Sequence, residues 1–137
     1  MTEKQIRIVV NGLESDAEQA IRKLTFDVVA NLVRAPTEGG TPVDTGWARA
    51  NWFANIGAGV PGSSPNPGEG TGVAGAVAER EARLGGIVGY KLASGPVFIS
   101  NNVPYILRLN EGSSKQAPAG FVQRAIQLAV TQLRSAL

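Results

Sequence analysis

Apolar residues follow a helical spacing near the N-terminal end of the chain. Five of them recur every three or four positions: Ala17, Ile21, Leu24, Val28 and Leu32. This spacing predicts one apolar stripe on a helix of about 20 residues. Ser15 followed by Glu18 fits a capping box at its start. The helix is expected to end near Ala35, because Pro36 disfavours helical geometry in the residue before it.

The C-terminal segment shows the same periodicity. Its main stripe consists of Val122, Ile126, Ala129 and Leu133, and the stripe is widened by Phe121, Ala125 and Leu128. Pro118 lies just before these residues. The pattern predicts a second amphipathic helix that runs almost to Leu137.

Between and before these helices the pattern changes to short alternations. Residues 5–10 alternate at Ile6, Ile8 and Val10 and predict a strand, which Asn11 and Gly12 would end in a turn. Residues 47–53 and 96–100 are further candidate strands. Residues 79–84 fit one or two helical turns ending at Gly85 and Gly86, and residues 103–109 fit a brief helix opened by Pro104. We therefore expect an α+β fold, in which a small, mostly antiparallel sheet packs with the long N-terminal helix and the C-terminal helix.

The segment 57–78 differs from the rest of the chain in composition. It holds seven glycines, three prolines and a single charged residue, Glu69. Such a segment buries too little side chain to offset its ordering entropy. We expect a flexible Gly/Pro-rich loop or arm that becomes ordered against a neighbouring subunit.

Length and composition exclude several classes of protein. The 137 residues fit one domain, 1–137, and 43% hydrophobic residues with 18% charged residues are not a disordered composition. The chain has no cysteine and no histidine, which excludes disulfides, a thiolate nucleophile, an imidazole base and nearly all catalytic zinc sites. The net charge of +2, without a run of Lys and Arg, does not indicate a nucleic-acid surface. No apolar run approaches the roughly 20 residues that span a bilayer, so we expect no membrane partner. We also expect no cofactor.

One short motif suggests an enzyme. Asp44-Thr45-Gly46 matches the catalytic triplet of aspartic proteases, in which two aspartates share a proton and activate water. A chain of this length would supply one half-site of a dimer. Against this, Trp47 stands where those enzymes have a small residue, and their fold is nearly all strand. The glycines of 68–72 lack a lysine, and Ser113 and Ser114 beside Lys115 lack a nucleophile elbow. We expect no enzyme, with the dimeric protease kept as an alternative.

Two longer blocks carry a more specific resemblance. Residues 41–52 read TPVDTGWARANW, and residues 101–122 read NNVPYILRLNEGSSKQAPAGFV. Together, and in this order, they resemble the tail-completion proteins of long-tailed bacteriophages, which are also called minor tail, neck or head–tail joining proteins. The blocks cover 34 of the 137 residues. Asn110 departs from the acidic residue that many members have, and Phe121 from a frequent methionine.

The resemblance implies a virion structural protein without catalytic activity. Such a protein is made in the cytoplasm of the host bacterium and forms a ring, usually a hexamer, at the head-proximal end of the tail tube. The ring ends the tube and joins it to the head connector or stopper proteins. The tail tube protein is then a partner, and DNA passes through the lumen. Another ring of the neck, a stopper or an adaptor, is the closest alternative.

In that role two sets of residues have an expected function. The expected subunit or partner interface consists of Trp47, Arg49, Trp52, Tyr105, Arg108, Glu111 and Lys115. The rings offer large rigid contact area and the charged groups offer pairing between subunits, although core or solvent-exposed positions remain alternatives for each. The expected structural turns contain Pro42, Asp44, Gly46, Gly112, Pro118 and Gly120, which fix the direction of the chain.

Overall fold

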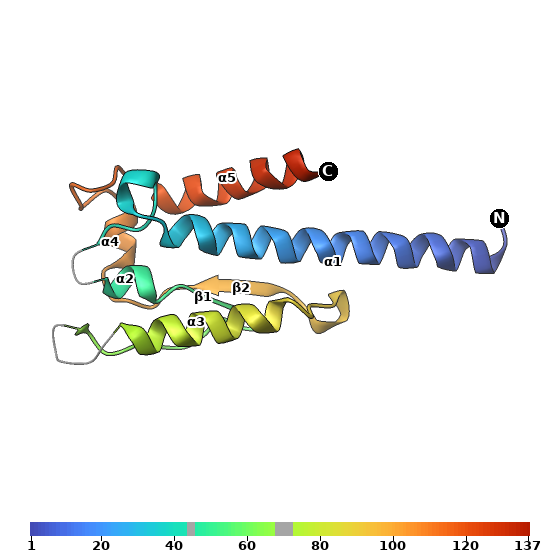
Figure 1. Ribbon diagram of the computed structural model, residues 1–137, viewed down its shortest axis with the longest axis horizontal. Coiled ribbons are helices and arrows are strands. Elements are labelled where there is room, and N and C mark those ends of the chain that lie inside the picture. The colour runs from blue at the N-terminus through green and yellow to red at the C-terminus, as the bar shows by residue number, and fades with distance from the viewer. Residues whose placement is uncertain (44–45, 68–72) are drawn as a thin grey trace.

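The computed structural model describes residues 1–43, 46–67 and 73–137 (Figure 1). The helices over these residues are α1 (Glu3–Val33), α2 (Trp47–Ala50), α3 (Ala74–Ile87), α4 (Ile106–Asn110) and α5 (Phe121–Ala136). The strands are β1 (Phe53–Ile56) and β2 (Val97–Ser100), and η1 (Pro36–Glu38) and η3 (Leu92–Ser94) are single 3-10 turns. The α+β class, the long N-terminal helix and the C-terminal helix are confirmed.

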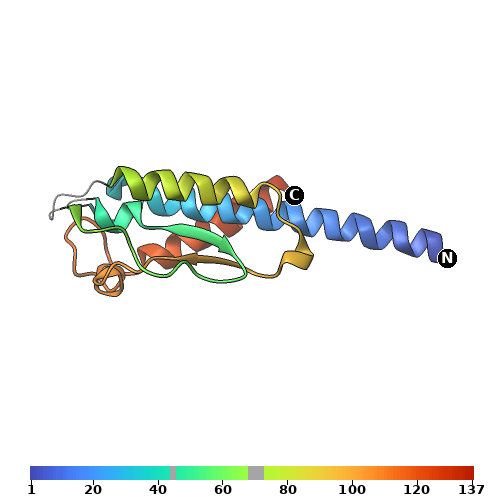
Figure 2. The same ribbon diagram turned by 90° about the horizontal axis from the view of Figure 1, so that it is seen from below.

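Helix α1 forms the middle layer of the molecule. Helix α5 runs antiparallel along one side of its C-terminal half, and the sheet lies on the other side with α3 against β1 (Figures 1 and 2). Over the described residues the sheet has two antiparallel strands, with Phe53 opposite Ser100 and Ile56 opposite Val97. Residues 96–100 were thus correctly expected to form a strand.

The first half of α1 corrects the expected strand at residues 5–10 and the expected turn at Asn11 and Gly12. The helix is continuous over 31 residues and begins at Glu3. Its capping box is formed by Thr2 and Gln5 rather than by Ser15 and Glu18. The Thr2 hydroxyl accepts from the Gln5 N–H at 3.1 Å, and the Gln5 side chain accepts from the Thr2 N–H at 2.8 Å. Thr2 and Gln5 thus cap the helix at Glu3, and the helix runs past Ser15 without a second cap.

Residues 47–53 also differ from the expected strand. Gly46, with φ of 82°, precedes one helical turn, α2, and the strand begins only at Phe53. Helix α3 is longer than the turns expected at 79–84 and continues through Gly85 and Gly86. The brief helix after Pro104 is present as α4, starting two residues later.

The expected arm at 57–78 is not confirmed over its described residues. Its last residues, from Ala74, belong to α3. Val60 is buried, and the Asn102 side chain donates to the carbonyl of Val60 at 2.6 Å. Side chains of the second sequence block therefore hold the start of this segment to the body, while residues 68–72 lie outside the described part.

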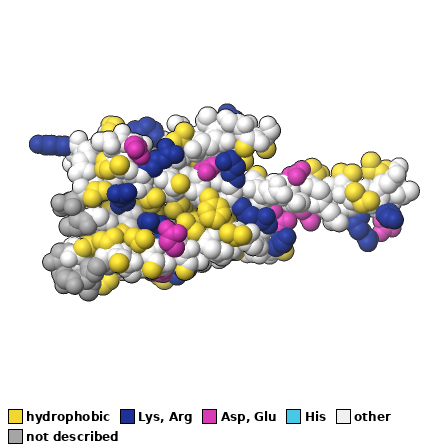
Figure 3. All heavy atoms as spheres, viewed as in Figure 1, with side chains coloured by type: hydrophobic (Ala, Val, Ile, Leu, Met, Phe, Trp, Pro, Cys, Tyr) yellow, Lys and Arg dark blue, Asp and Glu magenta, His cyan; other side chains and the backbone are white. Residues whose placement is uncertain are grey.

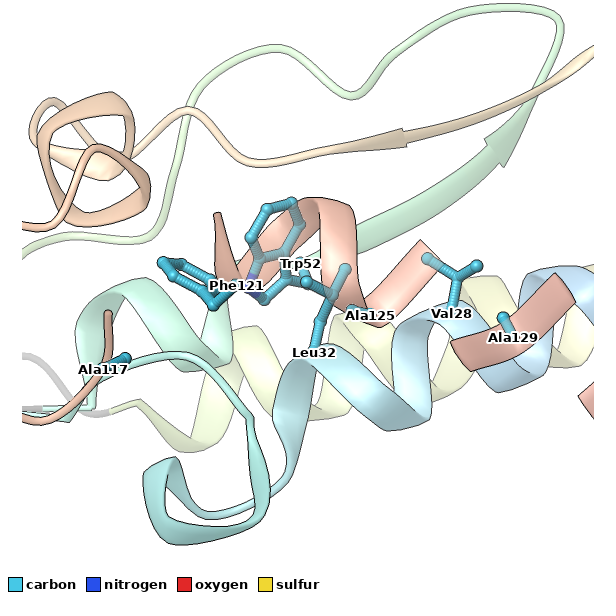
Figure 4. Close-up of a cluster of buried hydrophobic side chains, with 7 residues drawn as sticks. All are labelled: Val28, Leu32, Trp52, Ala117, Phe121, Ala125 and Ala129. Carbon is cyan, nitrogen blue, oxygen red and sulfur yellow. The ribbon is translucent and has the colours of Figure 1, made fainter. Parts of the chain in front are cut away.

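The main core cluster joins α1 to α5 (Figure 4). It consists of Val28, Leu32, Trp52, Ala117, Phe121, Ala125 and Ala129. The α5 side of this contact uses alanines, with Ala129 fully buried, so the two helix backbones approach closely. Smaller clusters around Phe53 and around Val29 fix the sheet and α3. Among the described residues, no helix combines the length and the hydropathy needed to cross a membrane.

Candidate functional site

The two sequence blocks meet at the end of the molecule that lies away from the N-terminus, where Figure 1 shows α2 and α4. The Gln116 side chain makes the contact between them. Its Oε1 accepts from the N–H of Val43 at 2.8 Å, and its Nε2 donates to the carbonyl of Val43 at 2.6 Å. This reciprocal pair imitates the bonding of a neighbouring strand. It fixes the loop before α5 against residues 42–43, the start of the turn before α2.

A second amide strengthens the same junction. The Asn101 side chain donates to the carbonyl of Ala48 in α2 at 2.7 Å and accepts from the N–H of Val103 at 3.1 Å. Asn51 binds the Trp47 carbonyl and both the hydroxyl and the N–H of Ser64. Side-chain amides thus satisfy backbone groups that no helix or strand pairs.

Trp47 and Tyr105 come together at this junction, as two of the expected interface residues. Their ring centroids lie 5.6 Å apart at 65°, an edge-to-face contact. The Trp47 Nε1–H donates to the carbonyl of Ser64 at 2.7 Å, which fixes the orientation of the indole. Both side chains are half-buried.

The two rings form part of the wall of an open pocket of about 340 Å³. Other described residues that line it are Pro42, Leu109, Ser114 and Gln116. None of the described lining residues carries a charge at neutral pH. Aromatic faces with a few hydroxyl and amide groups suit the binding of a neutral side chain or a peptide segment.

Three charged residues of the expected interface lie close in sequence to residues that line this pocket. Arg108 lies on α4, Glu111 directly follows that helix, and Lys115 stands between two pocket residues, Ser114 and Gln116. All three side chains are exposed. Exposed charges near an aromatic centre suit a protein–protein contact, which typically has an apolar core and a polar rim.

Trp52 does not lie at this surface. It is 5% exposed, and its Nε1–H donates to the Thr41 hydroxyl at 2.8 Å. That hydroxyl donates in turn to the carbonyl of Leu32 at 2.7 Å. Of the two alternatives for Trp52, the structure shows core packing, and we leave Trp52 out of the proposed interface.

Arg49 is engaged within its own chain. Its Nε donates to the carbonyl of Val33, the last residue of α1, at 2.6 Å. The Arg49 carbonyl lies 3.4 Å from a guanidinium nitrogen of Arg80. Burial lowers the pKa of the Arg80 guanidinium from its usual value, Glu81 counters that shift, and Arg49 adds to it. Arg49 therefore holds the end of α1 to α2 and α3.

The expected turn residues are placed as structural elements. Gly112 and Gly120 have φ of 99° and 84°, conformations that favour glycine. A side chain on Gly112 would also press on Ala119. Pro42 is buried, and the Pro118 carbonyl accepts from Arg124 at 3.1 Å. Asp44, the expected turn and protease residue, lies outside the described residues.

Several residues that hold the site were missed by sequence reasoning. They are Thr41, Asn51, Asn101, Asn110 and Gln116. Asn110 accepts from the Val122 N–H at 3.0 Å and thereby satisfies a free donor at the start of α5. All five lie inside the two sequence blocks, and the amide side chains of four of them are the signal that could have pointed to these positions.

No family model, curated protein or solved structure matches this chain.

Proposed function

We propose that this chain is a structural protein of a long-tailed bacteriophage virion, acting as a tail-completion or neck protein. Its copies form a ring, expected to be a hexamer, which ends the tail tube and joins it to the head connector. The proposal is carried by one observation. The two blocks that resemble this class, residues 41–52 and 101–122, converge on one end of the molecule and are tied together through Gln116 and Asn101.

The end of the molecule that holds α2, α4 and the pocket, here called the pocket end, is suited to contact with another protein of the virion. Half-buried Trp47 and Tyr105 offer aromatic area beside the exposed Arg108, Glu111 and Lys115. An aromatic centre with exposed charges near it is suited to a protein partner. We assign this end to the tail tube protein or to the head connector, with DNA passing through the lumen of the ring.

The experiment is deletion of the gene from the parent phage, followed by electron microscopy of the lysate. The expected result is filled heads beside separate or abnormally long tails, with joined particles restored when the protein is supplied in trans. Normal, infectious particles after deletion would overturn the proposal. Heads that lose their DNA would instead favour a stopper or adaptor ring.

Complementation with single variants tests the pocket end. Lys115→Glu reverses an exposed charge next to two pocket-lining residues and is expected to reduce joined particles about tenfold, since rim charges control encounter. Glu81→Lys is the matched control, because it also reverses an exposed charge but lies on α3, outside the pocket lining. Asp44→Asn addresses the protease alternative. If it abolishes a pepstatin-sensitive cleavage while the fold is intact, the protein is an enzyme.

A further inference from the structure

The N-terminal part of α1 projects beyond every other described element (Figures 1 and 2). Residues 3–16 are exposed throughout, although five large apolar side chains lie among them, four of which gather on one side of the helix. Their exposed fractions are 49% for Ile6, 50% for Val9, 44% for Val10 and 64% for Leu13. We call these four residues the projecting stripe. Apolar side chains gathered on an isolated helix mark a contact with another molecule.

The projecting stripe continues a face that is already an interface inside the chain. At 100° per residue, Ile6, Val10 and Leu13 point in nearly the same direction as Leu24 and Val28. Leu24 and Val28 belong to the core cluster that α5 covers. Figure 3 shows hydrophobic side chains on the upper side of the projecting part, where α5 also lies. The α1 surface that binds a helix therefore extends several turns past the end of α5.

A groove opens where α5 stops. Its volume is about 340 Å³, and its lining includes Asp16 and Ala20 from α1 together with Leu133 and Leu137 from the C-terminal end. Leu137 is 92% exposed. The groove therefore lies between the projecting stripe and the end of α5, where a helix bound to the projecting stripe would also contact it.

Helix α5 and the residue after it carry further apolar side chains outside the buried core clusters, of which Ile126 and Leu137 are exposed and Val130 and Leu133 half-buried. These four are spaced at four, three and four residues. We call them the outer stripe of α5. Ile126 is 44% exposed, whereas Ala125 and Ala129 on the inner face are buried. From Ile126 to Leu137 it runs for about 16 Å, which equals the length of α1 from Ile6 to Ala17.

The charges beside the two stripes are complementary. The acidic Glu14 and Asp16 follow the projecting stripe, and residues 3–16 carry three acidic and two basic side chains. Helix α5 contains two arginines, Arg124 and Arg134, and no acidic residue. Glu3 is paired with Arg7 in the same helix, so Glu14 and Asp16 supply the excess negative charge. This complementarity favours a second copy of the chain as the occupant, since each copy brings both the two carboxylates beside the projecting stripe and the arginines of α5.

We infer that the projecting stripe of α1 binds the outer stripe of α5 in a second copy of this chain, head to tail. The two surfaces differ, so the contact is heterologous. Repeating it gives a closed ring when the rotation between copies closes and an open filament otherwise, and the proposed function requires the ring. This inference rests on the ring in the proposed function and names the surfaces that build it. The pocket end, which lies at the opposite end of α1, stays free for the next component.

The test measures the molar mass of the purified full-length chain by light scattering during gel filtration. Val10→Glu damages the projecting stripe and Ile126→Glu damages the outer stripe of α5. Ile8→Glu is the matched control, because Ile8 is 62% exposed on the same part of α1 but points away from the stripe. We expect assemblies for the wild type and Ile8→Glu, and single chains for the other two variants.

Mixing the two damaged variants makes the test specific. A Val10→Glu chain keeps an intact outer stripe, and an Ile126→Glu chain keeps an intact projecting stripe. One intact contact then remains, so the mixture is expected to form heterodimers and nothing larger. Circular dichroism of each variant verifies that it is folded.

Three outcomes would overturn the inference, and they differ in what they leave standing. Normal assembly of both variants refutes these surfaces but leaves a ring built by others. Assembly of Ile126→Glu alone shows that the projecting stripes of two copies pair with each other in a symmetric dimer. A wild-type chain that stays monomeric at its highest soluble concentration overturns the ring as well.

Discussion

A single hydroxyl group connects three parts of this molecule. The Thr41 hydroxyl donates to the carbonyl of Leu32 in α1 and accepts from the Trp52 indole in the core. Thr41 and Trp52 are the first and last residues of the first sequence block. The two ends of the block are therefore joined to each other through the Thr41 hydroxyl, and this hydroxyl also ties them to α1.

The first prediction is a double-mutant cycle on this pair. Thr41→Val keeps the shape but leaves the buried indole N–H unpaired, and is expected to lower the free energy of unfolding by ~1–3 kcal/mol. Trp52→Phe removes the donor together with part of the ring. The double variant should be less destabilised than the sum of the single variants, by about 1 kcal/mol. Urea unfolding measures all three, with the exposed Thr37→Val as a control expected to change stability by under ~0.5 kcal/mol. Additive single effects would show that the two side chains do not interact.

Sequence reasoning at the residue scale identified important residues better than it identified their partners. Trp47 and Tyr105 were expected to act at a surface, and the structure brings their rings together. Arg49 was expected to pair between subunits, yet it donates to the carbonyl of Val33. Every residue has a backbone carbonyl, so the sequence does not indicate which one a distant side chain will bind. Only the tertiary structure brings the two groups together.

Helix α1 shows why the elements were harder to predict than the fold class. Residues 6, 8 and 10 are apolar, a pattern that fits an alternating strand as well as a helix whose stripe includes Ile6 and Val10. The Asn11-Gly12 pair then favoured a turn. The deciding fact is that Ile6, Val10 and Leu13 continue the stripe that begins again at Ala17. The class and the C-terminal helix, in contrast, followed from long periodic segments that allow one interpretation.

The second prediction concerns Gly12 within that helix. A side chain there meets no atom within 4 Å, so Gly12→Ala is expected to stabilise the projecting part by roughly 0.5–1 kcal/mol and to raise helical content. Circular dichroism measures the gain. Gly40→Ala provides the contrast, because its new methyl group would overlap the backbone of Arg34 and destabilise the body. A loss of helix in Gly12→Ala would mean that residues 5–13 are not helical.

At the scale of the whole molecule, stability is distributed unevenly along one helix. The C-terminal half of α1 is buried between α5 and the sheet, with Val29 at 2% and Leu32 at 1% exposure. The N-terminal half has no described element against it. Short helices without tertiary contacts are marginal in water, so the two halves should open at very different rates.

The third prediction follows from this difference and is measured by hydrogen exchange with mass spectrometry. In the dilute single chain, amides of residues 5–13 should exchange quickly while those of residues 25–33 exchange slowly. Raising the concentration should protect residues 5–13 and the outer stripe of α5 together. The Val10→Glu variant supplies the reference without assembly. Protection of residues 5–13 in dilute solution would show that this half is stable without a second copy.

The unbroken course of α1 has a mechanical consequence. Its 31 residues form one rod of about 46 Å, which runs from the projecting stripe to the hydrogen bonds of the Thr41 hydroxyl. A tilt of about 5° at one end would displace the other by about 4 Å over this length. In the proposed ring, each subunit would act as a lever, because the contact of its projecting stripe with a neighbouring copy would set the position of the pocket at the other end. A ring of such levers would transmit a change at one pocket to the adjacent subunits and act as a single mechanical unit.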